Sequence, residues 1–479
     1  MRPSSSRERV DGAGGDCQTV AMRGRPRALD RRAFLSLTGA AFGAAPFHAL
    51  ACRAARSDLR PIPGDPAPTG IDYGPLAPVR DETTRLPLLQ LPAGFRYRSF
   101  GWIGDPLERG LATPGLHDGM AAFPAGGRRV YLVRNHELRA GPAIASRPIY
   151  DRNGCGGTTT VEFDTARGSV RRAWVSLAGT AVNCAGGPTP WGSWLTCEET
   201  VLGPGGGNDF EEPHGYIFDV PADGRATAEP LRAMGRFVHE AIAVDPDTGI
   251  VYETEDQQTA GFYRFLPAEP GNLAAGGRLE MLAIADAPEA DLRAGQRTGD
   301  WRGVEWVPID DPDPPDAGPN SVFAQGRAGG GATFRRLEGI WYGGGRIYVV
   351  STEGGDVRMG QVWEYEPGRE RLRLLFESPG PDVLDMPDNL CVSPRGGIVL
   401  CEDGRDGNFL RGLRTDGRIF PFARNNVVLD GRPNGISGDF RSSEFAGATF
   451  SPDGRWLFVN VQIPGVTLAI TGPWTDGAL

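Results

Sequence analysis

The sequence predicts an all-β fold, a six-bladed β-propeller with a metal cluster in its central channel, from its composition, an internal repeat and the spacing within that repeat. The chain of 479 residues contains 69 glycines and 41 prolines, which are spread between short apolar runs and form no long tracts. This distribution is typical of many short strands joined by tight turns. The length allows one large all-β unit as well as about two or three domains, so the repeat has to decide.

Six segments share one pattern: a step that contains glycine or an acid, a short apolar strand, a turn, and a second strand with a polar end. They are HDGMAAFPAGGRRVYLVRNHE from His117, NCAGGPTPWGSWLTCEE from Asn183, HEAIAVDPDTGIVYETED from His239, LEGIWYGGGRIYVVSTEGG from Leu337, PDNLCVSPRGGIVLCEDG from Pro387 and FAGATFSPDGRWLFVNVQ from Phe445. Turn residues such as DPDTG and SPDG stand midway, which predicts a β-hairpin in each copy. Hairpins at intervals of roughly 50 to 100 residues, each followed by further short strands, are typical of propeller blades.

The spacing between the first and last polar residue of each copy is nearly constant. Fifteen residues separate Cys184 from Glu199, Glu240 from Glu255, Glu338 from Glu353 and Asp388 from Asp403, whereas the first copy (Asp118 to Glu137) is longer and the last (Ala446 to Gln462) differs by one. A hairpin brings these two residues to one end, and the first strand of a blade lines the channel of a propeller. The opening residues are therefore expected to form a ring: Asp118, Cys184, Glu240, Glu338, Asp388 with Asn389, and Ala446. In the alternative interpretation, these acids are turn residues that face water.

Acidic residues outnumber basic ones, 60 to 50, and the formal charge is −10. This disfavours nucleic-acid binding, which needs a basic face, and is compatible with bound cations. Several carboxylates on one axis repel one another and need cations or protons, and hard oxygen ligands suit Ca²⁺. A thiolate at Cys184 favours iron or zinc, and a His-rich zinc site is disfavoured because the chain has only five histidines. We therefore predict a mixed site, with a transition metal near Cys184; the alternative is that Cys184 is an inert buried residue.

Arg336 and Asn135 are the candidate catalytic and substrate-binding residues. A metal cluster of this kind can orient and polarise a phosphate ester, and a guanidinium holds phosphoryl oxygens by bidentate contacts. Arg336 stands two residues before Glu338, and Asn135 two before Glu137. In extended strands each therefore shares a face with its acid, whereas Arg335 points away. The alternatives are a surface arginine and a turn asparagine.

The N-terminus predicts export. Arg31 and Arg32 precede the apolar stretch AFLSL and a run of small residues to Ala51, which is typical of a twin-arginine signal. Ala49-Leu50-Ala51 offers a small-x-small cleavage site before Cys52; lipid anchoring at Cys52 is the less favoured alternative. No other run has the roughly 20 apolar residues that a membrane span needs. We expect a signal peptide and leader at 1–57, an extended segment at 58–93 and one propeller domain at 94–479. The twin-arginine export machinery is then a partner, and the mature protein is periplasmic or secreted.

Six short motifs together resemble the PhoX-type alkaline phosphatases, a domain family of formerly unknown function. They are NHE at Asn135, NCAGGPTPWGSWLTCEE at Asn183, GRFVHEA at Gly235, RLEG at Arg336, MPDN at Met386 and VNVQIPG at Val459. The resemblance runs from about Gly94 to Pro473. It implies an exported, calcium-dependent, iron-containing phosphatase on a propeller scaffold. Such a phosphoric ester hydrolase releases phosphate from small phosphomonoesters, and its cofactors are Ca²⁺ and Fe³⁺.

The resemblance also implies roles for single residues. Cys184 matches the family's iron ligand, Glu240, Glu338 and Asp388 match further metal ligands, and Arg336 matches the arginine that faces phosphate. Either acid of the pair Glu198 and Glu199 is a candidate ligand, although the repeat spacing favours Glu199, and Glu137 of the NHE motif completes the candidate set.

Two other functions remain open at this point. One is a calcium-dependent lactonase or phosphotriesterase-like propeller hydrolase, and the other is a noncatalytic secreted propeller that binds metal. Cys184 discriminates between them and the iron-containing phosphatase, because a calcium-only site needs no thiolate ligand.

Overall fold

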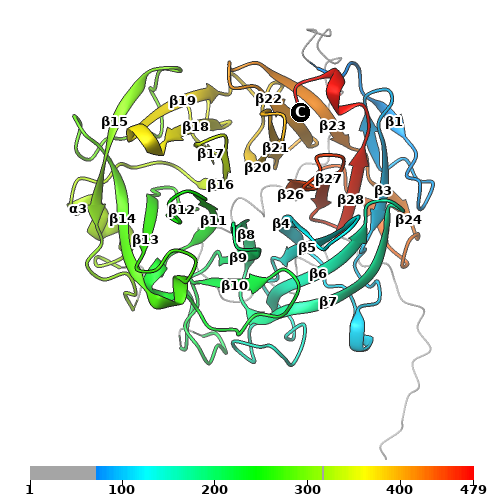
Figure 1. Cartoon of the computed structure of the whole chain (residues 1–479), viewed down its shortest axis with the longest axis horizontal. Helices are drawn as coiled ribbons and strands as arrows, with labels where there is room; N and C mark the ends of the chain where they lie inside the picture. The colour runs from blue at the N-terminus through cyan, green and yellow to red at the C-terminus, as the bar shows by residue number, and fades with distance from the viewer. Residues whose placement is uncertain (1–71, 206, 316–317) are drawn as a thin grey trace, which may run out of the picture.

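The computed structural model describes residues 72–205, 207–315 and 318–479. The predicted signal peptide and leader (1–57), and residues 58–71 of the predicted extended segment 58–93, lie outside the described residues. The described chain is built of antiparallel β-sheets that stand around one axis (Figure 1). Its one α-helix among these residues is α3 (Val322–Ala328), and no helix there is long and apolar enough to cross a membrane.

Two sheets follow one another at the start of the ring. The first contains β4 (His117–Pro124), β5 (Arg129–His136), β6 (Gly156–Asp164) and β7 (Ser169–Thr180). The second contains β8 (Asn183–Pro188), β9 (Ser193–Glu198) and β10 (Ile217–Pro221).

A nine-stranded sheet joins the next two hairpin units through its outer strands. One half contains β11 (His239–Val244), β12 (Val251–Glu255), β13 (Phe262–Pro267) and β14 (Gly277–Ile284). The other half contains β16 (Leu337–Gly343), β17 (Arg346–Ser351), β18 (Gln361–Glu366) and β19 (Arg371–Glu377). Strand β15 (Trp301–Pro308) pairs with β14 on one side and β19 on the other.

The last sheets use strands from both ends of the described chain. One contains β20 (Pro387–Val392), β21 (Ile398–Glu402), β22 (Phe409–Leu413) and β23 (Ile419–Asn425), extended by β2 (Leu89–Leu91) and β1 (Ala77–Val79). The other contains β26 (Phe445–Phe450), β27 (Leu457–Val461), β28 (Val466–Thr471) and β3 (Arg96–Phe100). A separate hairpin contains β24 (Val428–Asp430) and β25 (Ser437–Asp439). Because β3 pairs with β28, an early strand completes the last sheet by hydrogen bonds.

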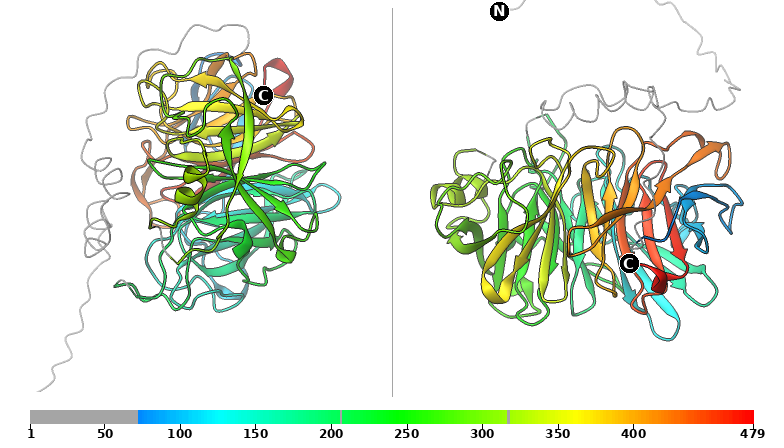
Figure 2. Two further views of the ribbon diagram at one scale, coloured as in Figure 1. Left: turned by 90° about the vertical axis from the view of Figure 1, so that its left-hand side faces the viewer. Right: turned by 90° about the horizontal axis from the view of Figure 1, so that it is seen from above.

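The first strand of each repeat lies nearest the axis, and these six strands contact one another in a closed cycle. β4 contacts β8, β8 contacts β11, β11 contacts β16, β16 contacts β20, β20 contacts β26, and β26 returns to β4. Seen from the side, the strands run between the two faces of a disc (Figure 2). The predicted all-β propeller is therefore confirmed as a propeller-like fold.

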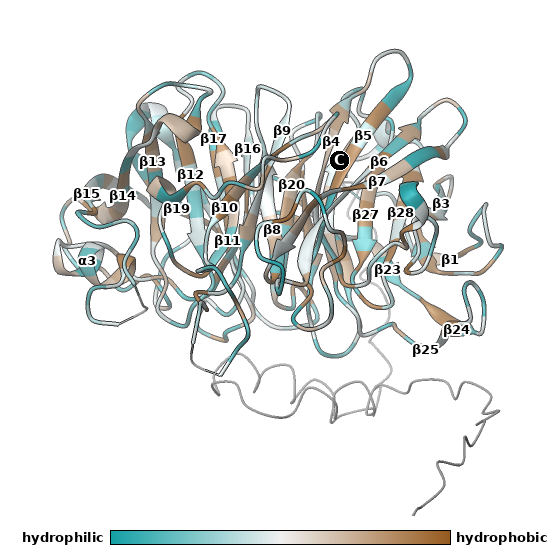
Figure 3. Ribbon diagram, turned by 90° about the horizontal axis from the view of Figure 1, so that it is seen from below, coloured by the Kyte–Doolittle hydropathy of each residue, from teal (hydrophilic) through white to brown (hydrophobic). Residues whose placement is uncertain are grey.

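The hydrophobic core lies between neighbouring sheets. One cluster joins the β20–β23 sheet to the β26–β28 sheet through residues such as Phe422 and Leu468. Another joins the two halves of the nine-stranded sheet through Tyr252 and Trp363. Figure 3 shows the hydrophobic segments along the strands. Face-to-face packing of this kind leaves the ends of the inner strands for polar residues.

Every inner strand contains a β-bulge or register irregularity. The irregularities lie between His117 and Met120, Asn183 and Gly186, His239 and Ile242, Leu337 and Ile340, Pro387 and Asn389, and Ala446 and Thr449. A bulge bends its strand and redirects a side chain. In five of the six strands, the predicted opening residue lies within this irregular step, so the repeat seen in the sequence is also a repeat of backbone geometry.

One backbone hydrogen bond recurs in all six hairpins. It joins the residue after the second strand to the carbonyl of the residue before the first strand, with distances of 2.9 Å from Glu137 N to Leu116 O and 2.9 Å from Glu199 N to Val182 O. The other donors are Asp256, Thr352, Asp403 and Gln462, with acceptors at Val238, Arg336, Met386 and Glu444. Asp256 and Thr352 thus replace Glu255 and Glu353, so the fifteen-residue count is wrong by one in these two copies, because their hairpins differ in length.

Candidate active site

Three overlapping groups of carboxylates lie where the inner hairpins begin and end. Within each group, the carboxylate oxygens lie within 4.8 Å of one another. The groups are Glu240, Glu338 and Asp388; Asp118, Glu137 and Glu444; and Asp388, Asp403 and Glu444. Because Asp388 and Glu444 each belong to two groups, the carboxylates form one continuous cluster, which we call the acidic cluster. The structure therefore brings together five predicted site residues, Glu137, Glu240, Glu338, Asp388 and the ring member Asp118.

Burial and mutual repulsion disfavour the ionised form of these acids. Burial is the largest cause and neighbouring carboxylates add to it, so that the pKa values of Asp118, Glu240 and Glu444 lie well above their usual range. The pKa of Asp388 is raised to about 6, first by burial. A hydrogen bond also links the carboxyl groups of Glu338 and Asp388. Without further positive charge, the acidic cluster must therefore hold protons.

Arg336 enters the acidic cluster as predicted. Its guanidinium binds Asp256 in a bidentate manner, at 2.8 Å from Nε and 2.9 Å from Nη2, and Nη2 lies 2.7 Å from Glu338 Oε1. Its Nη1 atom is buried, with no hydrogen-bond partner among the described residues, and lies 3.7 Å from Glu353 Oε1. The left-handed backbone at Arg336, with φ of 45°, directs the strand into its bulge. One fixed guanidinium nitrogen is therefore free to bind an additional acceptor.

A second arginine, Arg139, links the ends of two neighbouring hairpins, β4–β5 and β8–β9. Its Nη2 atom lies 2.9 Å from Glu199 Oε2 and also contacts Glu137 Oε1. Gln462 donates from the same region to Glu137 Oε2 at 2.7 Å and to Asp118 Oδ2 at 3.0 Å. Glu199 thus faces the acidic cluster, although it belongs to none of the three groups found among the described residues.

Glu198 points away from the acidic cluster, so its assignment as a metal ligand is wrong. Successive residues of a strand point to opposite faces, and Glu198 is fully buried on the face opposite to Glu199. Its carboxylate accepts hydrogen bonds from the backbone of Ala181, Gly215 and Tyr216 and from His214 Nδ1 at 2.6 Å. These contacts occupy it fully, and they attach the hairpin to the start of β10.

The side chain of Asn135 also has a structural role, in place of the predicted contact with phosphate. Its Nδ2 atom donates to Cys184 O at 3.1 Å and Ala185 O at 2.8 Å, while Oδ1 accepts from Trp194 Nε1 and Thr196 Oγ1, both at 2.9 Å. An amide has two N–H groups and two carbonyl lone pairs. All four are used, so the buried Asn135 joins β5 to β8 and β9 and has no donor left for substrate.

Cys184 lies next to the acidic cluster but outside its three groups. Its Sγ atom is buried, 3.3 Å from His239 O and 3.4 Å from Glu240 O. Burial raises the pKa of the thiol well above its usual range, and the charges of Glu240 and Glu199 raise it further. The protonated thiol therefore donates to backbone carbonyls, and the prediction that Cys184 binds a metal stays a prediction.

Sequence reasoning missed Glu444, Asp256 and Arg139 and left Asp403 out of the ligand set. Glu444 stands two residues before Ala446, as Arg336 stands two before Glu338. The same alternation argument would have found it. Asp256 was missed because the constant count selected Glu255, whose carboxylate instead accepts from Gly261 N and Tyr263 Oη. Arg139 gave no signal, since it lies outside the repeat.

Comparisons with known proteins identify the family of the chain. Residues 71–465 match the family model described as alkaline phosphatase PhoX. The chain belongs to the PhoX alkaline phosphatase family. The resemblance of the short motifs is thereby confirmed over most of the chain. No curated protein matches the sequence.

Two solved structures are similar to this chain, to different degrees. Pseudomonas fluorescens PhoX, in complex with vanadate, a transition state analogue, is 17% identical, with 86% of this chain and 99% of that chain covered and a TM-score of 0.59. XC5397 from Xanthomonas campestris, described as a gluconolactonase, is 16% identical, with 87% and 99% covered and a TM-score of 0.40. The first of these supports the propeller-like fold of this PhoX family member.

The contact between Glu198 and His214 gives a pH-dependent prediction. Burial lowers the pKa of His214, but Glu198, at 2.6 Å, and Asp151, at 3.4 Å, outweigh it, and the net pKa is raised. A raised histidine pKa adds stability below the unfolded value of about 6.5, and this stability is lost as pH rises through the folded value. We expect the free energy of unfolding of wild type minus that of His214→Gln, measured with urea, to decrease from pH 6 to pH 9, by about 1 to 2 kcal/mol.

His117→Gln is the matched control. Burial, followed by the charges of Arg134 and His136, lowers the pKa of His117 well below its ordinary value. A histidine whose pKa is lowered affects stability in the opposite direction. The free energy of unfolding of wild type minus that of His117→Gln should therefore rise or stay level as pH increases. A difference for His214→Gln that grows with pH would contradict the charged pair.

Proposed function

We propose that this chain is an exported, calcium-dependent and iron-containing alkaline phosphatase that hydrolyses phosphomonoesters and releases inorganic phosphate. The observation that carries the proposal is a fixed arginine, Arg336, with one unpartnered guanidinium nitrogen beside three overlapping carboxylate groups. Membership of the PhoX family supports the reaction class, phosphoric ester hydrolysis. The closed cycle of six inner strands supports six blades around a central metal cluster.

The donor atoms fit hard cations. Calcium takes six to eight oxygen ligands, often carboxylates, and the acidic cluster offers the three groups of carboxylate oxygens described above. Glu338 Oε1 is buried and accepts no hydrogen bond among the described residues, despite its short distance to Arg336. The residues that would hold calcium are Glu240, Glu338, Asp388, Asp403, Glu444, Asp118 and Glu137. When bound, such cations would neutralise the carboxylates and stabilise negative charge on a phosphoryl group.

The residues of the chain supply orientation. Asp256 and Glu338 fix the Arg336 guanidinium from two sides, so that Nη1 can donate to a phosphoryl oxygen without reorganisation. Arg139 is held by Glu137 and Glu199 in a similar way. The two fixed guanidinium groups, those of Arg336 and Arg139, lie in the same ring and therefore select an anionic, multiply charged substrate. Burial of these groups strengthens the selection, since charges interact more strongly away from water.

Iron and export rest on further observations. The proposal of Fe³⁺ at Cys184 is supported by the family motif and by Glu240, whose charge acts on the Cys184 thiol more strongly than any other. Export through the twin-arginine machinery, to the periplasm or beyond, is supported by Arg31, Arg32 and the apolar run that follows. Lipid anchoring at Cys52 remains the less favoured alternative.

A second candidate function is a calcium-only propeller hydrolase of the lactonase or phosphotriesterase type. The observation that favours it is the position of Cys184, which lies outside the three carboxylate groups and donates to backbone carbonyls. A noncatalytic metal-binding propeller is the limiting case, in which the cations are purely structural.

Calcium removal tests the main proposal. We expect protein from a host with twin-arginine export to contain calcium and to hydrolyse p-nitrophenyl phosphate. Chelation with EGTA should reduce the rate by roughly 100-fold or more, because charge stabilisation in the transition state is lost. Calcium should restore the rate and magnesium should not, since magnesium demands a smaller octahedral site. Calcium without phosphatase activity would favour the lactonase-type or noncatalytic alternative.

Cys184→Ser tests the iron ligand. The variant should remain folded and keep calcium but lose iron, measured by elemental analysis, because a serine hydroxyl does not replace a thiolate ligand. The matched control is Cys197→Ser, a buried cysteine in the same motif that we assign no metal. Wild-type iron content in Cys184→Ser would contradict the ligand role of Cys184, and the absence of iron from the wild-type protein would support the calcium-only function.

Arg336→Ala tests the phosphate contact. The catalytic efficiency kcat/KM should fall by roughly 100-fold, the usual effect of losing one donor to developing negative charge, while calcium content is unchanged. Arg335→Ala is the control, because the charges that act most strongly on the Arg335 guanidinium are those of Arg358 and Arg293, which are not members of the acidic cluster. Equal effects of the two substitutions would show that Arg336 has no special contact with the substrate.

A further inference from the structure

A second polar site lies far from the acidic cluster, in a pocket lined by five arginines. The pocket has a volume of about 170 Å³ and lies between the β4–β7 sheet and the β26–β28 sheet. The arginines are Arg96, Arg98, Arg128, Arg167 and Arg455, and the only acid in its lining is Asp453. The chain as a whole carries a charge of −10, so a general excess of basic residues does not account for this concentration.

The pocket and the acidic cluster lie at opposite ends of the same strands. β5 begins at Arg129, next to Arg128, and ends at His136, next to Glu137. At about 3.4 Å per residue, its eight residues separate the two sites by roughly 24 Å. A ligand in the arginine pocket is therefore not a ligand of the acidic cluster.

Within the part of the chain that the structure describes, two of the five arginines have no acidic partner. Arg96 and Arg98 share Glu82, at 3.1 Å and 2.8 Å, and Arg167 lies 3.6 Å from Asp164. Arg128 and Arg455 form no ion pair with any acid among the described residues, from 72 to 479 with its short gaps. An oxyanion would therefore offset positive charge that the protein itself leaves uncompensated.

The walls that carry these two cations are rigid. Thr165 donates to Arg128 O from its backbone N at 2.8 Å and from Oγ1 at 2.9 Å. Thr471 Oγ1 and Trp474 Nε1 donate to Arg455 O at 2.9 Å and 3.0 Å. Backbones fixed in this way reduce the entropy lost when the guanidinium groups bind a ligand.

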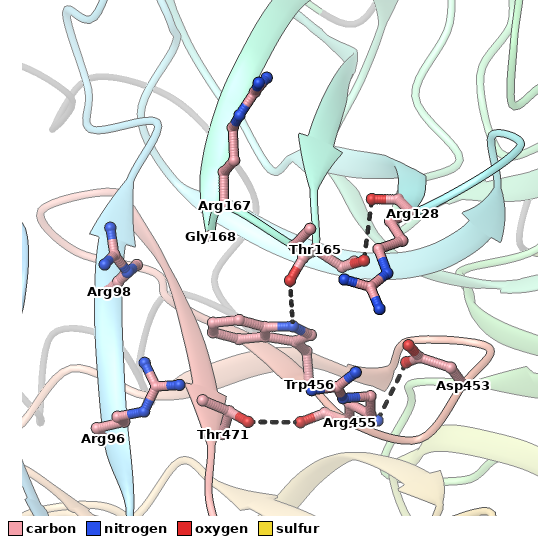
Figure 4. Close-up of a pocket in the computed structure, with 11 residues that line it drawn as sticks. Arg96, Arg98, Arg128, Thr165, Arg167, Gly168, Asp453, Arg455, Trp456 and Thr471 are labelled. Atoms are coloured by element: carbon pink, nitrogen blue, oxygen red, sulfur yellow. Dashed lines mark hydrogen bonds between the residues drawn. The ribbon is translucent and has the colours of Figure 1, made fainter.

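Trp456 forms the floor of the pocket. Its indole is buried and donates from Nε1 to Thr165 O at 3.1 Å. Figure 4 shows Arg128 and Arg455 on one side of the indole, Arg96 and Arg98 on the other, and Arg167 directed away from it. A Cβ atom at Gly168 would lie 2.9 Å from Arg98 Cδ and 3.3 Å from Trp456, so the glycine, with φ of +63°, leaves this space open.

From this arrangement we propose that the arginine pocket is a second anion site, which binds the phosphate oxyanion outside the acidic cluster. Guanidinium groups match phosphate geometry by paired hydrogen bonds, and the pocket can hold a single phosphate group with a small substituent. Two sources share this chemistry: free inorganic phosphate and the headgroup of an anionic phospholipid. The inference does not depend on the proposed reaction, because binding is measured without hydrolysis.

The test compares the wild-type protein with the double variant Arg128→Gln/Arg455→Gln. Inorganic phosphate is titrated by calorimetry at low ionic strength, and vesicles of phosphatidylcholine with and without phosphatidylglycerol are used in cosedimentation. The double variant should lose one class of phosphate sites. The affinity of the arginine pocket for phosphate should fall by about tenfold or more for each charged contact that is lost. Hydrolysis of p-nitrophenyl phosphate should be unchanged, which separates this result from failure at the acidic cluster.

Arg297→Gln is the matched control, because Arg297 is exposed on a distant loop and forms no ion pair within the described ranges. Phosphate binding that is lost in the double variant and kept in Arg297→Gln supports free phosphate as the ligand. Binding only to phosphatidylglycerol vesicles, lost in the same way, supports the lipid headgroup. Equal losses in the double variant and Arg297→Gln, or no binding in either experiment, would overturn the proposal. Arg455→Lys should show an intermediate affinity, because it keeps the charge without the planar fork.

Discussion

The organisation of the site depends on electrostatic repulsion between carboxylates that a closed cycle of strands forces together. Each inner strand is held by its neighbours on both sides, and β3 closes the last sheet onto the start of the chain. The carboxylates cannot relax by moving apart without opening this ring. Their charge must therefore be balanced by protons, by Arg139 and Arg336, or by cations. Burial first, and then the charges of neighbouring carboxylates, raise the pKa values of Asp118, Glu240 and Glu444.

Adjacent acids at the ends of the hairpins divide two tasks between them. Glu198, Glu255 and Glu402 each accept hydrogen bonds from backbone N–H groups near the start of the next strand, at Gly215, Gly261 and Phe409. The residue that follows each of them, Glu199, Asp256 or Asp403, turns to the axis side and donates its backbone N–H across the hairpin. Strand alternation alone produces this division. Each of these pairs of adjacent acids looks in the sequence like two ligands. It contains one residue that binds backbone N–H groups and one residue that faces the axis.

The repeat made much of this predictable. The hairpins and the ring positions Asp118, Glu240, Glu338 and Asp388 follow from the common register of six similar segments. The orientation of Arg336 follows from two-residue alternation along a strand. The count failed where hairpin length changed, as at Glu255, because a sequence does not show where a bulge adds a residue. Asn135 was misjudged because alternation gives the face of a side chain and says nothing about which backbone carbonyls of β8 meet it there. The arginine pocket depends on contacts between sheets distant in sequence, so no local pattern indicated it.

The same repulsion links cation binding to stability. An acid whose pKa is raised in the folded state releases its proton more readily after unfolding, so folding loses stability as pH rises through the unfolded value towards the folded one. Asp388, with a pKa raised to about 6, and its more strongly shifted neighbours act in this direction together. A cation that binds only the folded ring reverses the effect by mass action. The proposed metal-dependent alkaline phosphatase would therefore need its cations first to stabilise a ring of ionised acids. Any part they take in catalysis rests on that condition.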